Sequence, residues 1–200
     1  MRSRRSPSAA LLAVVSVLFV AGCSGLLQSD VPPAKTFWLE PVTTGTASGE
    51  STVSVGIAVT AVPGLDTDHW LALERDRELR RYAAGRWPDN APDYFESVIR
   101  RSFSETGHWQ RVVASQDAYQ ADVTLRLELQ ESFVVRQTNQ IRIRFAGTLE
   151  CDGQAVAIAK SHSASLSGER LQDIAAAYQT AIDDVTTALI EQVQRSSCEA

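Results

Sequence analysis

The side chains best suited to chemistry are scattered along this 200-residue chain rather than grouped. The three histidines, His69, His108 and His162, have no second histidine or cysteine at the spacing of a metal site. Ser167 stands in the sequence Leu-Ser-Gly and lacks the Gly-x-Ser-x-Gly elbow of serine hydrolases. We therefore expect the histidines on the surface or in loops, and we expect no catalytic residue, no metal ion and no cofactor.

A pair of carboxylates leads to the same expectation. Asp183 and Asp184 are neighbours in a predicted helix, where consecutive side chains point about 100° apart, so they cannot act together as acid and base. We expect both on the solvated face of that helix. The chain also contains no glycine-rich phosphate loop. The sequence therefore favours a protein that is not an enzyme.

Cys23 is the cysteine whose surroundings predict a modification. It follows an arginine-rich start and an apolar run over residues 9–20, which is typical of a secretory signal and too short to span a bilayer core of ~30 Å. The sequence Val20-Ala21-Gly22-Cys23 looks like a bacterial lipobox, which predicts a signal peptide over residues 1–22 and acyl chains on Cys23. An ordinary signal cut nearby would instead leave a free thiol. Ser24, where Asp would favour the inner membrane, favours the outer membrane and a periplasmic domain.

The other two cysteines, Cys151 and Cys198, form a candidate disulfide, because the periplasm is oxidising. Cys151 ends a predicted strand and Cys198 follows a predicted helix. A bridge would therefore tie the C-terminal tail to the sheet. The alternative is two unpaired thiols.

The charge of the chain excludes one class of partner. Without residues 1–22 it carries 16 basic and 24 acidic side chains. An acidic surface argues against nucleic acid, which is bound through lysine and arginine, and against broad adhesion to anionic lipid. The polar composition of much of residues 23–52 predicts a flexible tether before a folded domain over residues 53–196. Within the tether, Phe37-Trp38-Leu39 is too apolar for a free linker and predicts a short edge strand or a docking segment.

Alternation of apolar and polar residues predicts strands over residues 53–61, 123–135, 141–151 and 155–165. The last three form an antiparallel meander, because Asp152-Gly153 is a strong signal for a two-residue hairpin turn.

Helical spacing predicts one helix that starts at Asp89 or Asn90 and stops at Gly107. It predicts a second, longer helix that Ser167 caps and that runs over residues 171–193. We therefore predict an α+β fold, a single two-layer domain in which two helices pack on one face of an antiparallel sheet.

Two features allow more than one interpretation. Residues 69–87 fit a helix no better than they fit two short strands. Arg126, Arg142 and Arg144, opposite Glu128, are either exposed cross-strand ion pairs, each worth under ~1 kcal/mol, or a face that binds a partner.

Several motifs in order resemble the ABC-type transport auxiliary lipoproteins. After the lipobox come an aromatic-x-Leu segment, a strand that ends in a Pro-x-Leu-Asp turn, a charged stretch, an Arg-Trp pair and an amphipathic helix. In this chain they are Phe37-Trp38-Leu39, the strand from Val55 with its turn residues Pro63, Leu65 and Asp66, Trp70 to Tyr82, Arg86-Trp87, and Tyr94 to Phe103. Phe-Trp stands where the family usually has Tyr, and Pro88 stands where it usually has Ala.

The resemblance implies paired strands over residues 69–82 and a non-enzymatic role. Members look like outer-membrane partners of transport systems that contain an ABC ATPase, a permease and a mammalian-cell-entry (MCE) domain protein. Such systems move phospholipid or other hydrophobic molecules between the two membranes. The MCE protein and the permease and ATPase would be the protein partners, and whether the chain is a homo-oligomer stays open. The alternative is a structural or assembly lipoprotein of the cell envelope.

Overall fold

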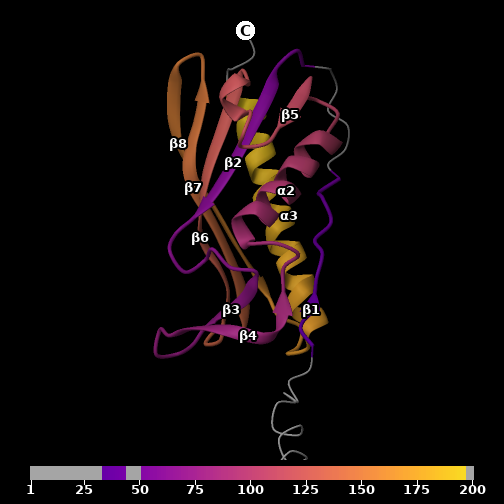
Figure 1. Cartoon of the computed structure of the whole chain (residues 1–200), viewed down its shortest axis with the longest axis vertical. Coiled ribbons are helices and arrows are strands. Elements are labelled where there is room, and N and C mark those ends of the chain that lie inside the picture. Colours follow the sequence, from indigo (N-terminus) through magenta and orange to yellow (C-terminus); the bar gives the residue numbers. More distant parts are fainter. Residues whose placement is uncertain (1–32, 44–50, 197–200) are drawn as a thin grey trace, which may run out of the picture. The chain divides into compact units, whose positions relative to one another are not determined.

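The computed structural model describes residues 33–43 and 51–196, apart from the side chain of residue 83. Figure 1 shows the elements of this part of the chain. They are β1 (Lys35–Thr36), β2 (Ser54–Ala61), β3 (His69–Leu73), β4 (Leu79–Arg86), α2 (Ala91–Glu105), β5 (Arg111–Val113), the 3-10 helix η1 (Ala118–Gln120), β6 (Val123–Val135), β7 (Gln140–Cys151), β8 (Gln154–Ser165) and α3 (Leu171–Arg195).

Strand β6 organises the eight-stranded sheet because three other strands pair with it. One edge pairs with β7 along its whole length, and β7 in turn pairs with β8. The other edge is shared, since β2 pairs with residues 123–129 of β6 and β3 pairs with residues 134–135. Strand β5 extends the sheet beyond β2, and β4 and β1 extend it beyond β3.

The single α+β domain is confirmed, as is the antiparallel meander of β6, β7 and β8. The turn at Asp152-Gly153 is also confirmed, with φ angles of 49° and 73° that the hairpin turn requires. The sheet is mixed, however, rather than antiparallel throughout, because β2 runs parallel to both β5 and β6. The reason is that α2 lies between β2 and β5 and returns the chain, so the next strand runs in the same direction.

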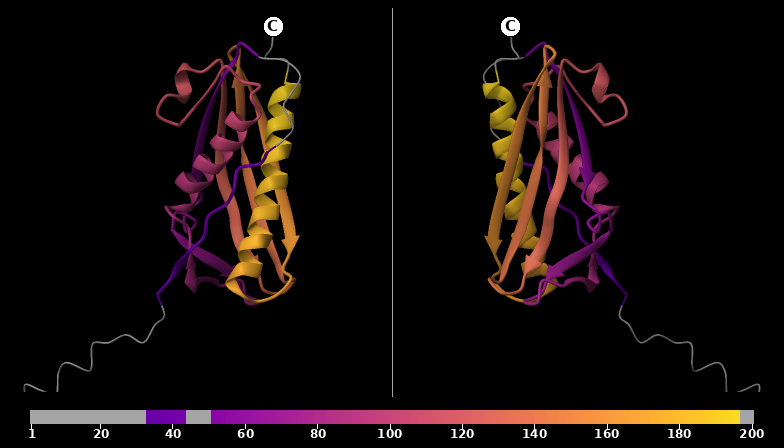
Figure 2. Two further views of the ribbon diagram at one scale, coloured as in Figure 1. Left: turned by 90° about the vertical axis from the view of Figure 1, so that its right-hand side faces the viewer. Right: turned by 90° about the vertical axis from the view of Figure 1, so that its left-hand side faces the viewer.

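Both helices cover the same face of the sheet, as predicted (Figure 2). Helix α2 packs on β2 and β5, and α3 packs on β7 and β8. The periodic apolar residues of both helices are buried: Phe95, Val98, Ile99 and Phe103 in α2, and Ile174, Tyr178, Ile182, Val185, Leu189 and Val193 in α3. This apolar stripe is what holds each helix to the sheet.

The helix starts differ in detail from the prediction. Asn90 precedes α2, but its side chain makes no capping hydrogen bond. Helix α3 begins after Arg170 rather than at Ser167, which corrects the predicted cap. The backbone N–H of Arg170 donates to Oδ2 of Asp173 at 3.2 Å, so this carboxylate satisfies a group at the start of the helix.

A buried aromatic cluster lies between β3, β4 and the two helices. The ring of Trp87 lies 4.8 Å from Tyr178 of α3, 5.2 Å from Trp70 of β3 and 5.5 Å from Tyr94 of α2. Gly85 makes room for this cluster, because a Cβ there would lie 2.4 Å from Cε3 of Trp70. The cluster therefore joins the end of β4 to β3 and to both helices.

Residues 37–42 cross the two helices as a strap. The backbone N–H of Leu39 donates to the hydroxyl of Tyr94, and that of Val42 donates to Oγ of Ser102 at 2.9 Å, both in α2. The amide of Gln179 in α3 exchanges hydrogen bonds of 2.8 and 3.0 Å with the backbone of residue 40. Leu39 is buried, so this part of residues 23–52 is the predicted docking segment and not a free linker.

A carboxylate joins the starts of two neighbouring strands. Oδ2 of Asp122 accepts hydrogen bonds from the backbone N–H of Ser54 at 2.7 Å and from its hydroxyl at 2.6 Å. These hydrogen bonds hold the pKa of Asp122 below its usual value. They fix the register at which β2 meets β6.

Gly85→Ala should lower the free energy of unfolding by about 2 kcal/mol, since the new methyl group would overlap the ring of Trp70. Urea unfolding measures this loss. In a Trp70→Phe background the same change should cost less, because the smaller side chain lacks the indole atoms that lie closest to residue 85. Equal costs in both backgrounds would contradict the contact.

Asp122→Ala should lower the free energy of unfolding by about 1 kcal/mol at pH 7. Because the folded pKa is lowered, this contribution is present above the unfolded pKa of about 3.9 and is lost as the pH falls through the folded pKa. Melting curves between pH 7 and pH 2 should therefore converge for the two proteins. Asp117→Ala, an exposed carboxylate in the same loop, serves as the control and should melt like the unchanged protein.

Candidate functional site

Each of the three histidines contacts a neighbouring side chain. Nε2 of His162, in β8, lies 2.9 Å from Oδ2 of Asp184 in α3. Nε2 of His69, in β3, lies 3.9 Å from Oδ1 of Asp68. His108 packs edge-on against the ring of Trp109. Within residues 33–43 and 51–196, no group of three His, Cys, Asp or Glu side chains could hold a metal ion.

The two neighbouring carboxylates of α3 have different surroundings. Asp184 is exposed, as predicted, and pairs with His162. Asp183 is half-buried, and its Oδ1 accepts a hydrogen bond of 2.7 Å from Gln179. Burial raises the pKa of Asp183. Because the two residues contact different neighbours, they do not form an acid–base pair.

The cross-strand arginines form ion pairs, but not with the predicted partner. Nε of Arg126 lies 3.4 Å from Glu150, and Nε of Arg142 lies 3.5 Å from Glu131. Arg144 donates to the side-chain oxygen of Gln130 at 3.1 Å. Glu128 is not their partner because Arg126 lies on the same strand, and because the register places Ala146 opposite Glu128.

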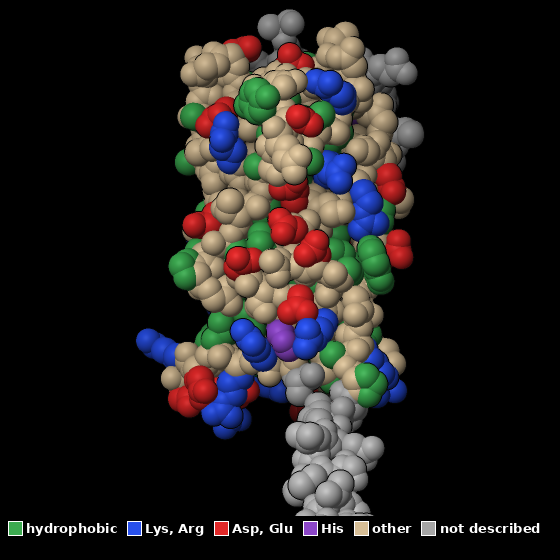
Figure 3. All heavy atoms as spheres, viewed as in Figure 1, with side chains coloured by type: hydrophobic (Ala, Val, Ile, Leu, Met, Phe, Trp, Pro, Cys, Tyr) green, Lys and Arg blue, Asp and Glu red, His purple; other side chains and the backbone are tan. Residues whose placement is uncertain are grey.

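Two hollows of the described surface are lined largely by polar side chains. One, of about 610 Å³, lies at the β3–β4 hairpin and is lined by Glu74, Arg75, Asp76, Arg80 and Arg136. Figure 3 shows the charged side chains at this lower end of the molecule. Another, of about 400 Å³, is lined by residues 51–52 and 107–110. Neither has the apolar walls that an acyl chain would need.

The Pro-x-Leu-Asp motif forms a tight turn after β2. The backbone N–H of Leu65 donates to the carbonyl of Val62 at 3.1 Å, and Gly64 between them has a φ of 94°. Pro63 and Gly64 thus hold the positions that a type II turn favours. Leu65 is buried in the core, while Pro63 and Asp66 are exposed.

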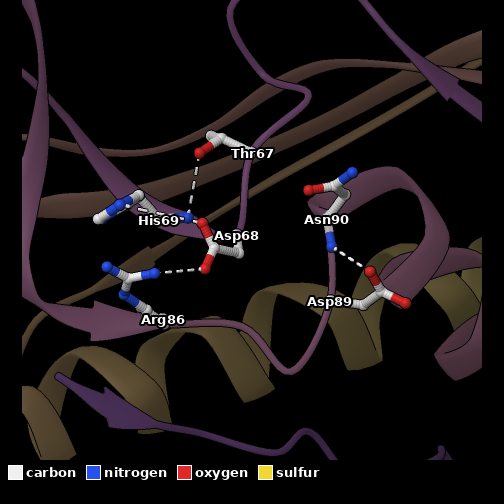
Figure 4. A network of polar contacts seen from close by, with 6 residues as sticks. All are labelled: Thr67, Asp68, His69, Arg86, Asp89 and Asn90. Carbon is white, nitrogen blue, oxygen red and sulfur yellow. Dashed lines mark hydrogen bonds and ion pairs between the residues drawn. The ribbon is translucent and has the colours of Figure 1, made fainter.

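Arg86 of the Arg-Trp pair lies beside Asp68, which follows this turn (Figure 4). Nη1 of Arg86 donates to Oδ2 of Asp68 at 2.8 Å, and the backbone N–H of Trp87 donates to the carbonyl of Asp68 at 2.7 Å. The carbonyl of Arg86 accepts from the N–H of Phe37, the first residue of the strap, at 3.1 Å. The carbonyl of Thr67 accepts from the N–H of Ala91 at 3.0 Å and so fixes the start of α2.

The motif residues therefore position elements of the fold. The structure brings both Arg86 and Trp87 to Asp68 but leaves Asp66 exposed. Sequence reasoning missed Asp68, because it stands 18 residues before Arg86 and only the fold brings the two side chains together. It also missed Glu96 of α2, which is largely buried. Its carboxylate accepts from the backbone N–H groups of Val59 and Ser115, both at 3.1 Å.

The predicted modification sites are only partly described. Cys151 ends β7 as predicted and is disulfide-bonded. Cys198 and Cys23 lie outside the described residues, so neither the pairing nor the acylation is tested. None of the helices in the described residues is both long and apolar enough to cross a membrane.

Comparisons with known proteins agree with this arrangement. The crystal structure of a Xanthomonas campestris protein of the DUF330 family matches with a TM-score of 0.67 and 19% identity, over 82% of this chain and 99% of that one. A crystal structure of an uncharacterized protein matches with a TM-score of 0.66 and 9% identity, over 81% of this chain and 99% of that one. No curated protein matches the chain.

The match to a family model shows which family the chain belongs to. The model described as the ABC-type transport auxiliary lipoprotein component matches residues 37–189. The match begins at the strap, contains the turn and the Arg-Trp pair, and ends within α3. The chain therefore belongs to the ABC-type transport auxiliary lipoprotein family.

Proposed function

We propose that the chain is a periplasmic lipoprotein, anchored in the outer membrane through Cys23, that docks an MCE-type ABC transport system. In this role it is a non-enzymatic component, and the system moves lipids or other hydrophobic molecules between the membranes. The observation that carries the proposal is the family match over residues 37–189. The MCE protein, the permease and the ATPase are the proposed partners.

The chain before the domain supports the anchor. Cys23 stands at the end of a signal-like segment, and eleven residues separate it from the strand residue Lys35. Extended, such a segment spans at most about 40 Å. The strap then holds the chain to both helices, so the anchor would place the domain close to the membrane.

The surroundings of the polar residues support a non-enzymatic role. His162 pairs with Asp184, and Arg86 pairs with Asp68. These contacts join elements of the fold to one another. The two polar hollows described above also favour a protein that contacts partners over one that encloses a substrate.

Affinity purification from native membranes tests the docking role. The full-length protein, tagged at its C-terminus and extracted in mild detergent, should recover the permease, the ATPase and an MCE-domain protein. Recovery of only barrel-assembly or cell-wall proteins would support the structural lipoprotein instead. A tagged lipoprotein of another family serves as the control.

Cys23→Ala should abolish palmitate labelling and move the protein from the membrane to the soluble periplasmic fraction. The melting temperature should stay unchanged, because residues 34–196 hold the packed domain. Fractionation and labelling in cells measure both effects. Cys198→Ala is the matched control and should keep its label, and a labelled Cys23→Ala protein would contradict the anchor.

The bond between Cys151 and Cys198 is proposed as well. A long chain segment would lie between the two cysteines, so loss of the bond should lower the free energy of unfolding by about 3–4 kcal/mol. Cys198→Ala and Cys151→Ala should destabilise to the same extent, as measured by urea unfolding. Non-reducing peptide mapping that finds both thiols alkylated would contradict the bond.

A further inference from the structure

The charge of the domain is unevenly distributed. What we call the basic end consists of the β3–β4 hairpin together with Lys35, which pairs with the end of β4, and Arg136, which contacts Glu74 and Tyr82 of the hairpin. It comprises the six basic residues Lys35, Arg75, Arg77, Arg80, Arg81 and Arg136, with the three acidic residues Glu74, Asp76 and Glu78. The other described residues hold ten basic and eighteen acidic side chains. An acidic domain therefore carries a positive region at one end (Figure 3).

Most of this positive charge is available to a partner. Residues 75–81 are all exposed. Arg75, Arg77 and Arg81 have no ion-pair partner within the described part of the chain. Arg80 pairs with Glu78 at 2.6 Å. Nε of Arg136 lies 3.8 Å from Oε1 of Glu74, and its Cζ lies 4.8 Å from the centroid of the Tyr82 ring.

The basic end is also where the chain from the anchor joins the domain. Lys35 of β1 pairs with Gly85 of β4, the second strand of the hairpin. In Figures 1 and 2 the strands β1, β3 and β4 lie together at the lower end, and η1 and β5 lie at the other. The thirteen residues of β6 span about 43 Å between the two ends. A tether of about 40 Å therefore brings the basic end to the membrane most readily.

We propose that the basic end binds anionic phospholipid headgroups of the membrane that holds the anchor, which rests on the proposed acylation of Cys23. Arginines near an anionic surface are attracted to it within a screening length of about 8 Å. Leu79, which is 40% exposed, lies among these arginines and can contact the headgroup region. The net acidity of the chain disfavours broad adhesion, so binding would be confined to this end and would orient the domain.

A second role of these arginines is to protect an edge strand. Most of β4 lies at the edge of the sheet, since β1 covers only residues 85–86, and charged side chains discourage pairing with other strands. Protection of an edge, however, does not require an excess of positive charge, because glutamate and proline also protect edges. The excess of arginine is what points to an anionic surface.

Hydrogen–deuterium exchange of the membrane-extracted protein tests the proposal. The protein, with the anchor it carries in cells, is placed in vesicles of phosphatidylethanolamine alone or with about 30% phosphatidylglycerol. Amides of residues 74–81 should exchange several-fold more slowly in the anionic vesicles, and about 0.5 M salt should remove the difference. Equal exchange in the two vesicles would overturn the proposal.

Two variants that each lose three positive charges make the test more specific. Replacing Arg75, Arg77 and Arg81 by Gln should remove the protection, since each arginine lost weakens the lipid contact about fivefold. Replacing Arg111, Arg126 and Arg195, which are exposed and lie toward the other end of the domain, by Gln should leave it in place. Slow exchange in β6 shows that either variant is folded, and equal protection in both would overturn the proposal.

The outcomes separate this inference from the proposed function. Missing palmitate on Cys23 would overturn the anchor and with it the inference. Unchanged exchange of residues 74–81 with Cys23 labelled would overturn the inference alone. Unchanged exchange, together with loss of transporter recovery in the Arg75, Arg77 and Arg81 variant, would make the basic end a protein-binding surface and contradict the membrane contact.

Discussion

The packing of Trp87 against Trp70 and Tyr178 is the interaction on which the arrangement of the domain depends. These rings come from the end of β4, from β3 and from α3, and all three are almost fully buried. Buried aromatic side chains contribute large apolar areas, and their contacts fix the angles at which the elements meet. The strap joins the same cluster, because the ring of Phe37 lies 4.7 Å from that of Trp70.

This cluster explains why the family motifs are spread over the chain. The turn after Pro63 directs residues 67–68 toward the backbone of residues 87 and 91, and Gly85 leaves space for Trp70. Each motif thus positions a segment that contacts the aromatic rings. The basic end, by contrast, lies on the outside of the domain, where residues 75–81 are exposed.

The sequence predicts the elements better than it predicts their pairing. Period-2 and period-3.6 patterns located the meander and both helices, because each has one buried face. Parallel pairing of β2 with β6 could not be predicted, since it depends on contacts between residues 55–61 and 123–129 that local patterns do not encode. Likewise, the positive region emerges only when Lys35, Arg136 and the hairpin come together, because composition averages it into a net negative charge.

We propose above that this lipoprotein docks an MCE-type ABC transport system at the membrane. Cross-linking followed by mass spectrometry on intact cells that carry the unmodified chain tests it most directly. We expect cross-links from this domain to the MCE protein or the permease of one transport system, and their loss in cells with Cys23→Ala. Cross-links to cell-wall or barrel-assembly proteins alone, or transporter cross-links that persist without the anchor, would contradict it.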